Sequence, residues 1–73
     1  MPRFFFDTLT EYGLRLDDLG SEFGSAEDAL ADTRVSALQI AAGDLRANLP
    51  VRDSIIFVRD EQGETIGQVK VGP

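Results

Sequence analysis

Two strand-like segments separated by a tight turn close the sequence, and they constrain the fold more than any other feature. Residues 54–59 are rich in β-branched and aromatic side chains, and residues 65–71 continue in the same manner. Between them, residues 60–63 (Asp-Glu-Gln-Gly) fit a type I turn in which Gly63 takes the left-handed conformation. This pattern predicts an antiparallel hairpin.

The length of the turn also predicts the pairing register of this hairpin. Val58 is expected opposite Ile66, and Ile55 opposite Val69. Side chains alternate between the two faces of a strand, so this register divides the apolar residues into two sets. One face is expected to carry Ile55, Phe57, Val69 and Val71. The other face is expected to carry Ile56, Val58 and Ile66.

A second hairpin is expected at the start of the sequence. Residues 3–9 are rich in aromatic side chains, and Phe4 and Phe6 fall on one face of an extended chain. Residues 10–13 fit a turn, and residues 14–17 alternate between apolar and polar side chains.

Residues 26–47 have the composition of a long helix, because Ala, Leu, Gln and Arg dominate the segment. Ser25 has the side chain of an N-cap, and Asp28 follows it at the spacing of a capping box. Asn48 and Pro50 supply a stop signal after the segment. The sequence therefore predicts one helix between the two hairpins.

The predicted order is ββαββ within one α+β domain that spans residues 1–73. The simplest packing is a four-stranded antiparallel sheet with the one long helix on one face. The strands are expected to contribute to the core Phe4, Phe6, Leu14, Leu16, Ile55, Phe57, Val69 and Val71. The helix is expected to contribute Leu30, Ala37, Ala41 and Leu45.

One helix covers only one face of a sheet, so this packing leaves apolar side chains without cover. The uncovered sheet face is expected to carry Phe5, Ile56, Val58 and Ile66. The apolar arc of the helix is also wider than one sheet contact needs, with a surplus at Val35, Leu38 and Ala42. Large exposed apolar patches mark interaction surfaces.

The sequence therefore predicts a small protein-binding domain that self-associates or docks on another protein as an accessory or regulatory subunit. The expected contact residues are Phe5, Ile56, Val58, Ile66, Val35 and Leu38. The alternative is a monomer in which twisted strands and long side chains shield the sheet face.

The composition removes most chemistry from consideration. The chain has no Cys and no His, so it lacks a thiolate nucleophile, a disulfide and the commonest general base and neutral metal ligand. Acidic pairs at 17–18 and 60–61 lie in expected turns, where solvated acids are ordinary. Gly20 and Gly24 precede the helix without a phosphate-binding motif. We therefore assign no catalytic, cofactor-binding or metal-binding residue and expect a non-enzymatic protein.

The charge balance bears on the choice of partner. Lys and Arg number 7 against 13 Asp and Glu, which gives a net charge of −6 and opposes binding to a phosphate backbone. Nucleic-acid binding, with Phe5 stacking on bases at the sheet face, is an alternative from another class. An acidic surface that mimics DNA is a further alternative, although the acidic residues are spread along the chain.

The start of the sequence also bears on location. Only three apolar residues in a row precede Asp7, which is too short a run for a signal-peptide core or a membrane span. We therefore expect no membrane partner. The absence of Cys fits a reducing cytoplasm, which is the location that we expect.

Three short motifs resemble a known family. They are the opening Met-Pro-Arg-Phe-Phe-Phe-Asp at 1–7, the segment Asp-Asp-Leu-Gly at 17–20 and the turn Val-Arg-Asp-Glu-Gln-Gly at 58–63. Together they resemble a family of short uncharacterised bacterial proteins, a domain of unknown function, that open M-P-R-[FY]-[FY]-F-[DN]. The resemblance covers nearly the whole chain. It implies a stand-alone bacterial domain, and it carries no activity or site across.

Overall fold

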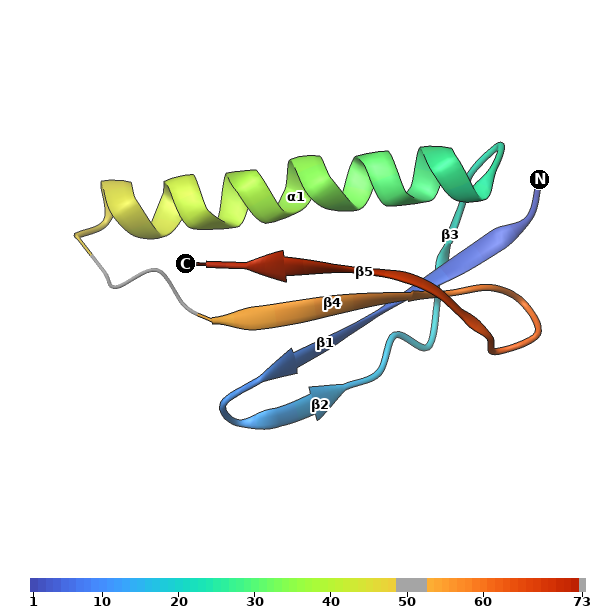
Figure 1. Cartoon of the computed structure of the whole chain (residues 1–73), viewed down its shortest axis with the longest axis horizontal. Helices are drawn as coiled ribbons and strands as arrows, with labels where there is room; N and C mark the ends of the chain where they lie inside the picture. The colour runs from blue at the N-terminus through green and yellow to red at the C-terminus, as the bar shows by residue number, and fades with distance from the viewer. Residues whose placement is uncertain (49–52, 73) are drawn as a thin grey trace.

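A long helix, α1 (Ala26–Arg46), extends along one face of an antiparallel sheet in the computed structural model, which describes residues 1–48 and 53–72 (Figure 1). The strands are β1 (Arg3–Thr10), β2 (Gly13–Arg15), β3 (Ser21–Glu22), β4 (Ser54–Arg59) and β5 (Thr65–Val71). The main strand order is β2-β1-β4-β5, and the short β3 pairs with β1. The predicted α+β class and the ββαββ order are confirmed, and β3 is the addition.

The N-terminal end of α1 has the cap that the sequence predicts. Ser25 is extended, and its Oγ accepts a hydrogen bond from the backbone N–H of Asp28 at 3.2 Å. Glu27 and Asp28 in the first turn and Arg46 in the last turn both complement the helix dipole. The helix ends at Arg46, and Asn48 follows it in the left-handed conformation with φ 57°. Pro50, which was expected to stop the helix, lies outside the described residues.

The turn between β4 and β5 forms as predicted. The N–H of Gly63 donates to the carbonyl oxygen of Asp60 at 3.0 Å, and Gly63 has φ 82°. The Asp60 carboxylate reinforces the turn, because its Oδ1 accepts from the N–H groups of Gln62 and Glu64 at 3.0 and 2.9 Å.

A β-bulge directly after this turn changes the register of the hairpin. Arg59 lies opposite Thr65, but the next pair is Val58 opposite Gly67, so Ile66 is an extra residue on β5. Beyond the bulge, Ile56 lies opposite Val69. The predicted pairings of Val58 with Ile66 and of Ile55 with Val69 are therefore wrong by one residue.

This shift exchanges the two faces of β4, because a one-residue slip moves every side chain to the opposite face. Val58 is fully buried and Ile56 is 7% exposed, both in clusters with residues of α1. The expectation that they lie on the uncovered face is wrong. Ile55 and Phe57 lie on the uncovered face instead, and neither packs beneath α1 as predicted. Ile66 was also expected on the uncovered face, but it packs against the core cluster that contains Val58.

The core consists of two clusters between α1 and the sheet. One contains Phe4, Ala29 and Val58, and the other contains Ala37, Ile56 and Val71. Partly buried side chains pack against these clusters, namely Phe6, Phe23, Leu30, Ile66 and Val69.

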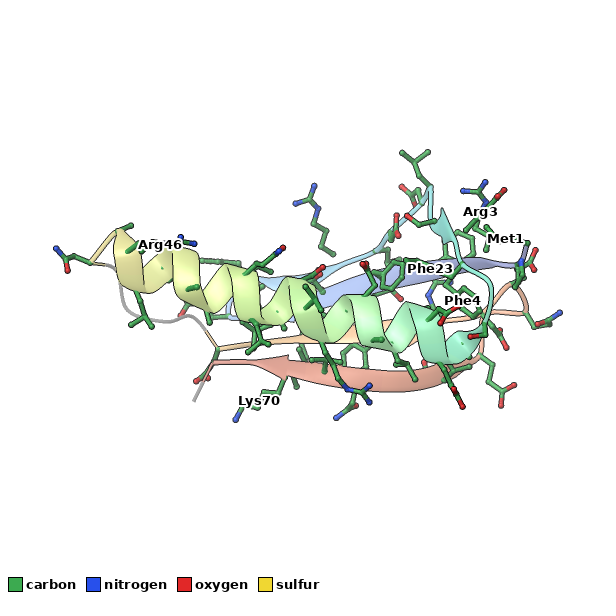
Figure 2. All side chains as sticks on the ribbon, turned by 90° about the horizontal axis from the view of Figure 1, so that it is seen from above. Met1, Arg3, Phe4, Phe23, Arg46 and Lys70 are labelled. Carbon is green, nitrogen blue, oxygen red and sulfur yellow. The ribbon has the colours of Figure 1, made fainter. Side chains whose placement is uncertain are left out.

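Phe23 adds an aromatic contact to this core that the sequence did not predict. It lies in the connection between β3 and α1, with its ring centroid 6.4 Å from that of Phe4 and 5.8 Å from that of Phe6. Figure 2 shows Phe23 and Phe4 together near the N-terminal end of α1. Phe23 therefore packs against the Phe4 and Phe6 side chains of β1 in the cluster that also contains Ala29 of α1.

Three leucines that were expected in the core are exposed. Leu14 and Leu16 are 57% and 58% exposed, because α1 contacts β5 and β4 and not the β2 end of the sheet (Figure 1). Leu45 is 66% exposed, since it points away from the buried stripe of α1.

We predict that Val58→Ala lowers the free energy of unfolding by about 2–3 kcal/mol, because it leaves a cavity in the core. Val35→Ala, at a site that is 53% exposed, is the matched control and should cost less than about 0.5 kcal/mol. Urea unfolding followed by circular dichroism measures both. Equal costs at the two sites would contradict the observed register.

Candidate docking surface

The helix α1 carries two stripes of side chains, and only one of them faces the sheet. The buried stripe consists of Ala29, Thr33, Ala37 and Asp44. The second stripe repeats at alternating intervals of four and three residues. It consists of Ala31, Val35, Leu38, Ala42 and Leu45, which we call the α1 seam.

Every residue of the α1 seam is exposed. Leu38 is 71% exposed, Leu45 66% and Val35 53%, which are high values for large apolar side chains. At 3.6 residues per turn, the seam is centred roughly 155° around the helix axis from the buried stripe. The seam therefore contributes little to the packing of α1 on the sheet, and it is free to contact another molecule.

The four-three spacing is the a and d spacing of a coiled coil, in which apolar side chains of one helix pack between those of another. Val35 and Ala42 take a positions, and the other seam residues take d positions. The flanking e and g positions set the pairing of such helices. The e positions are Asp32, Gln39 and Arg46, and the g positions are Glu27, Arg34 and Ala41.

A groove extends beside the seam, between α1 and β5. It is lined by Arg34, Ala37, Leu38, Ala41, Val69, Lys70, Val71 and Gly72. Leu38 belongs to both surfaces, so the apolar surface of the seam continues toward the edge of the sheet. β5 is the last strand in the main strand order, and this edge has no further strand among the described residues.

The uncovered face of the sheet is different, because an ion pair occupies its centre. Arg59 on β4 donates from Nε to Asp7 Oδ2 at 2.5 Å and from Nη2 to Asp7 Oδ1 at 3.1 Å. Asp7 on β1 is only 4% exposed. The Arg59 guanidinium also lies 5.1 Å from the centre of the Phe5 ring, so it shields the aromatic side chain that was expected to be available for docking.

Asp17 extends this network to the edge of the sheet. Its Oδ2 accepts from the N–H of Phe6 at 3.1 Å, in the interval between the parts of β1 that pair with β2 and with β3. Its Oδ1 accepts from the N–H groups of Leu19 and Gly20 at 3.2 and 3.1 Å. Its own N–H donates to Asp7 Oδ1 at 3.0 Å. The Asp17 carboxylate thus takes the place of a strand partner for the N–H of Phe6.

Gly20 is required where this loop returns to β1. Its φ is 68°, and a Cβ at this position would lie 2.8 Å from the carbonyl oxygen of Phe4. Only glycine combines this conformation with so close an approach of two backbones. The loop that carries Asp17 is therefore fixed by backbone geometry as well as by hydrogen bonds.

The network holds its groups in their charged forms. The hydrogen bonds from Arg59 lower the pKa of Asp7, and they outweigh the effect of burial, which raises it. Burial also raises the pKa of Asp17, but the three backbone N–H donors outweigh it and the net shift is downward. The hydrogen bonds to Asp7 raise the pKa of Arg59. These acids are engaged with structural partners, which is the arrangement of a stabilising network and not of a proton-transfer site.

The structure separates the six residues that were predicted to contact a partner. Ile56, Val58 and Ile66 belong to the core, and Phe5 lies on the uncovered face beneath Arg59. Only Val35 and Leu38 lie together on an exposed surface, the α1 seam.

Part of this surface was not predicted from the sequence, because Leu45 was expected to contact the sheet. The strict four-three repeat from Ala31 to Leu45 was the signal that could have found the whole seam.

In residues 1–48 and 53–72, no group of three or more Asp or Glu residues is placed to hold a metal ion. Within the same described residues, no helix has the length and the apolar content that crossing a membrane requires.

Taken together, these features define a class of small α+β protein in which one helix packs on an antiparallel sheet and exposes a second apolar stripe. The chain belongs to the DUF6894 family, a domain of unknown function, and the family model matches residues 3–72. The expected resemblance to a family of unknown function is thereby confirmed at the level of the family. No curated protein and no solved structure matches the chain.

We predict that the stability of the protein falls in acid because of Asp7 and Asp17. The pKa of each is lower in the folded than in the unfolded chain, so their stabilisation is fully present above the ordinary carboxyl range, near pH 4. It is lost as the pH falls through the lowered pKa values of the folded state. Urea midpoints measured from pH 7 to about pH 2.5 should show this decline.

The matched variants separate this network from the other acids. Asp7→Asn should lower the midpoint at pH 7 and flatten the acid decline, because it removes the carboxylate that pairs with Arg59. Glu61→Gln, on an exposed turn, should keep the wild-type profile. Parallel profiles for wild type and Asp7→Asn would contradict the assignment.

Proposed function

We propose that this protein is a non-enzymatic protein-binding domain that docks through the α1 seam on an α-helix of another polypeptide. The observation that carries the proposal is that α1 exposes a complete apolar heptad stripe while a different stripe fixes it to the sheet. An accessory or regulatory role fits such a domain. The bacterial and cytoplasmic setting expected from the sequence belongs to the same proposal.

The chemistry of the seam favours a helix as the occupant. A four-three repeat fits the groove between side chains of a second helix, whereas a strand offers side chains at a period of two. The large side chains of Val35 and Leu38 lie at the centre of the seam, between the small residues Ala31 and Ala42. A partner helix can therefore approach closely at two layers and insert its own side chains there.

The uncovered sheet face supports docking less well. Its centre is the Asp7–Arg59 pair, whose bonding groups already have partners, and any apolar partner would have to cover that pair.

The same geometry weakens the nucleic-acid alternative. Phe5 and Phe57 are on this face, but Arg59 is held by Asp7 and the net charge is −6. The acidic mimic of DNA gains no support from the sequence, in which the acidic residues are spread along the chain.

The proposal that the domain is not an enzyme has chemical support. The chain has neither His nor Cys, and the most perturbed carboxylates, Asp7 and Asp17, serve the fold. The family match names no activity. Protein binding thus accounts for the exposed apolar residues of the α1 seam without requiring a catalytic group.

A helical probe tests docking directly. The probe is a capped synthetic peptide with the sequence of residues 25–48, which carries the required stripe but lacks the sheet. We predict that adding it to methyl-labelled protein shifts the NMR signals of Val35, Leu38 and Leu45, because these side chains become covered. The signals of Val58 and Val71 should not move, since both are buried.

The control is Leu38→Glu protein, which should show no shifts, and the helicity of the peptide is followed by circular dichroism. Unchanged seam signals with up to about 1 mM peptide would overturn the proposed function, because affinity weaker than this corresponds to less than about 4 kcal/mol of binding free energy. Shifts confined to the methyl signals of Leu9 and Ile55 would move the docking site to the uncovered sheet face.

A further inference from the structure

We infer that the helix that docks on the α1 seam is α1 of a second copy of this chain, packed antiparallel across a two-fold axis. The inference rests on the proposed function, and it names the partner and the register. It follows from the pattern of large and small residues along the seam, and from the distribution of charge along α1.

The seam is complementary to itself in the antiparallel direction. In an antiparallel pair of helices, an a residue of one helix packs beside a d residue of the other. Val35 at a and Leu38 at d form two equivalent central layers, each with a Val from one copy and a Leu from the other. Ala31 and Ala42 then form the next layers outward. The two-fold axis passes between Val35 and Leu38, and each large side chain meets a large partner.

The charges on α1 select this direction over a parallel one. A parallel pair would place Asp28, at the a position before Val35, against the same residue of the second copy. It would also place Glu27 at g beside Asp32 at e of the second copy, so that two acids face each other. Both contacts are repulsive.

The antiparallel direction relieves this repulsion at each end of the pair. The first turn of α1 carries Glu27 and Asp28. The last turn carries Arg46, which Figure 2 shows at the opposite end of the helix from Phe4 and Phe23. Antiparallel packing brings Arg46 of one copy beside Asp28 of the second copy. It also places the positive N-terminal end of each helix dipole beside the negative C-terminal end of the other. Charge complementarity therefore favours a second copy in this orientation.

The position of the sheet leaves room for the second copy. The buried stripe of α1 is roughly 155° from the seam around the helix axis, so the two sheets lie on the outer sides of the pair. Val35 and Leu38 stay largely exposed beside the sheet, although Leu38 also borders the groove between α1 and β5. The seam from Ala31 to Leu45 spans about 21 Å at 1.5 Å per residue, which makes a small interface. We therefore expect a weak dimer, with a dissociation constant on the order of 10–100 µM.

Sedimentation equilibrium on the full chain tests the pairing. From about 10 µM to 1 mM, a range that brackets weak association, the mass of the wild type should rise above the 8.0 kDa of one chain toward twice that value. Leu38→Glu should raise the dissociation constant at least tenfold with an unchanged circular dichroism spectrum. Leu19→Glu is the matched control, because Leu19 is 82% exposed in a loop away from the seam, and it should behave as the wild type.

Cysteine cross-linking tests the orientation of the two helices. Because the chain has no Cys of its own, each single-Cys variant carries only the introduced thiol. Ala31→Cys and Ala42→Cys replace one small side chain by another. Mixed in equal amounts under oxidation, with one variant labelled with ¹⁵N, they should give mainly the mixed disulfide between positions 31 and 42. Disulfides between identical positions as the main products would overturn the antiparallel register.

The remaining outcomes separate this inference from the proposed function. A wild type that stays monomeric at 1 mM while the helical peptide still shifts the seam signals overturns self-pairing and leaves helix docking intact. If the peptide shifts no seam signal and the wild type also stays monomeric, both self-pairing and the proposed helix docking are overturned. Dimerisation that survives Leu38→Glu also overturns the inference, because the interface would then lie elsewhere.

Discussion

The extra residue in β5, Ile66, decides which side chains of β4 face α1. Without it, the alternation of side chains along the hairpin would place Val69 opposite Ile55 and would put Val58 on the open face. With it, Ile56, Val58, Val69 and Val71 all contribute to the side of the sheet beneath α1. This single set of apolar residues gives α1 one place to bind, and the buried stripe of the helix follows from it.

The same register places the charged residue Arg59 on the open face, opposite Phe5 and within reach of Asp7. A bare apolar sheet face would be prone to association. Here, Arg59 covers one aromatic side chain and neutralises a buried acid, so the open face is stabilised within one molecule. Leu14, Leu16 and Leu19 are also exposed, on β2 and in the loop after it. The α1 seam differs from them because it forms a regular stripe along one helix, and we propose protein binding on that ground.

Local features of the structure could be predicted from the sequence, whereas features that join distant residues could not. The cap at Ser25 and the turn at Gly63 involve neighbours in the chain, and both were predicted. The bulge at Ile66 was missed because turn chemistry alone predicts the register near the turn, while packing against α1 decides the pairing beyond it. The ion pair between Asp7 and Arg59 joins residues 52 positions apart, and no local sequence pattern predicts it. The excess width of the apolar arc identified Val35 and Leu38, but it did not separate Leu45 from the buried stripe.

For binding through the seam, α1 must pack on the sheet with one face and keep the other face free. Methyl nuclear Overhauser effects on dilute, monomeric protein test this most directly. We predict contacts from Val58 to Ala29 and from Ile56 to Ala37, and none from Leu38 or Val35 to β1 or β4. Contacts from Ile55 and Phe57 to α1, with Val58 free of them, would contradict the account, because the bulge would be absent and the sheet would present its other face to the helix.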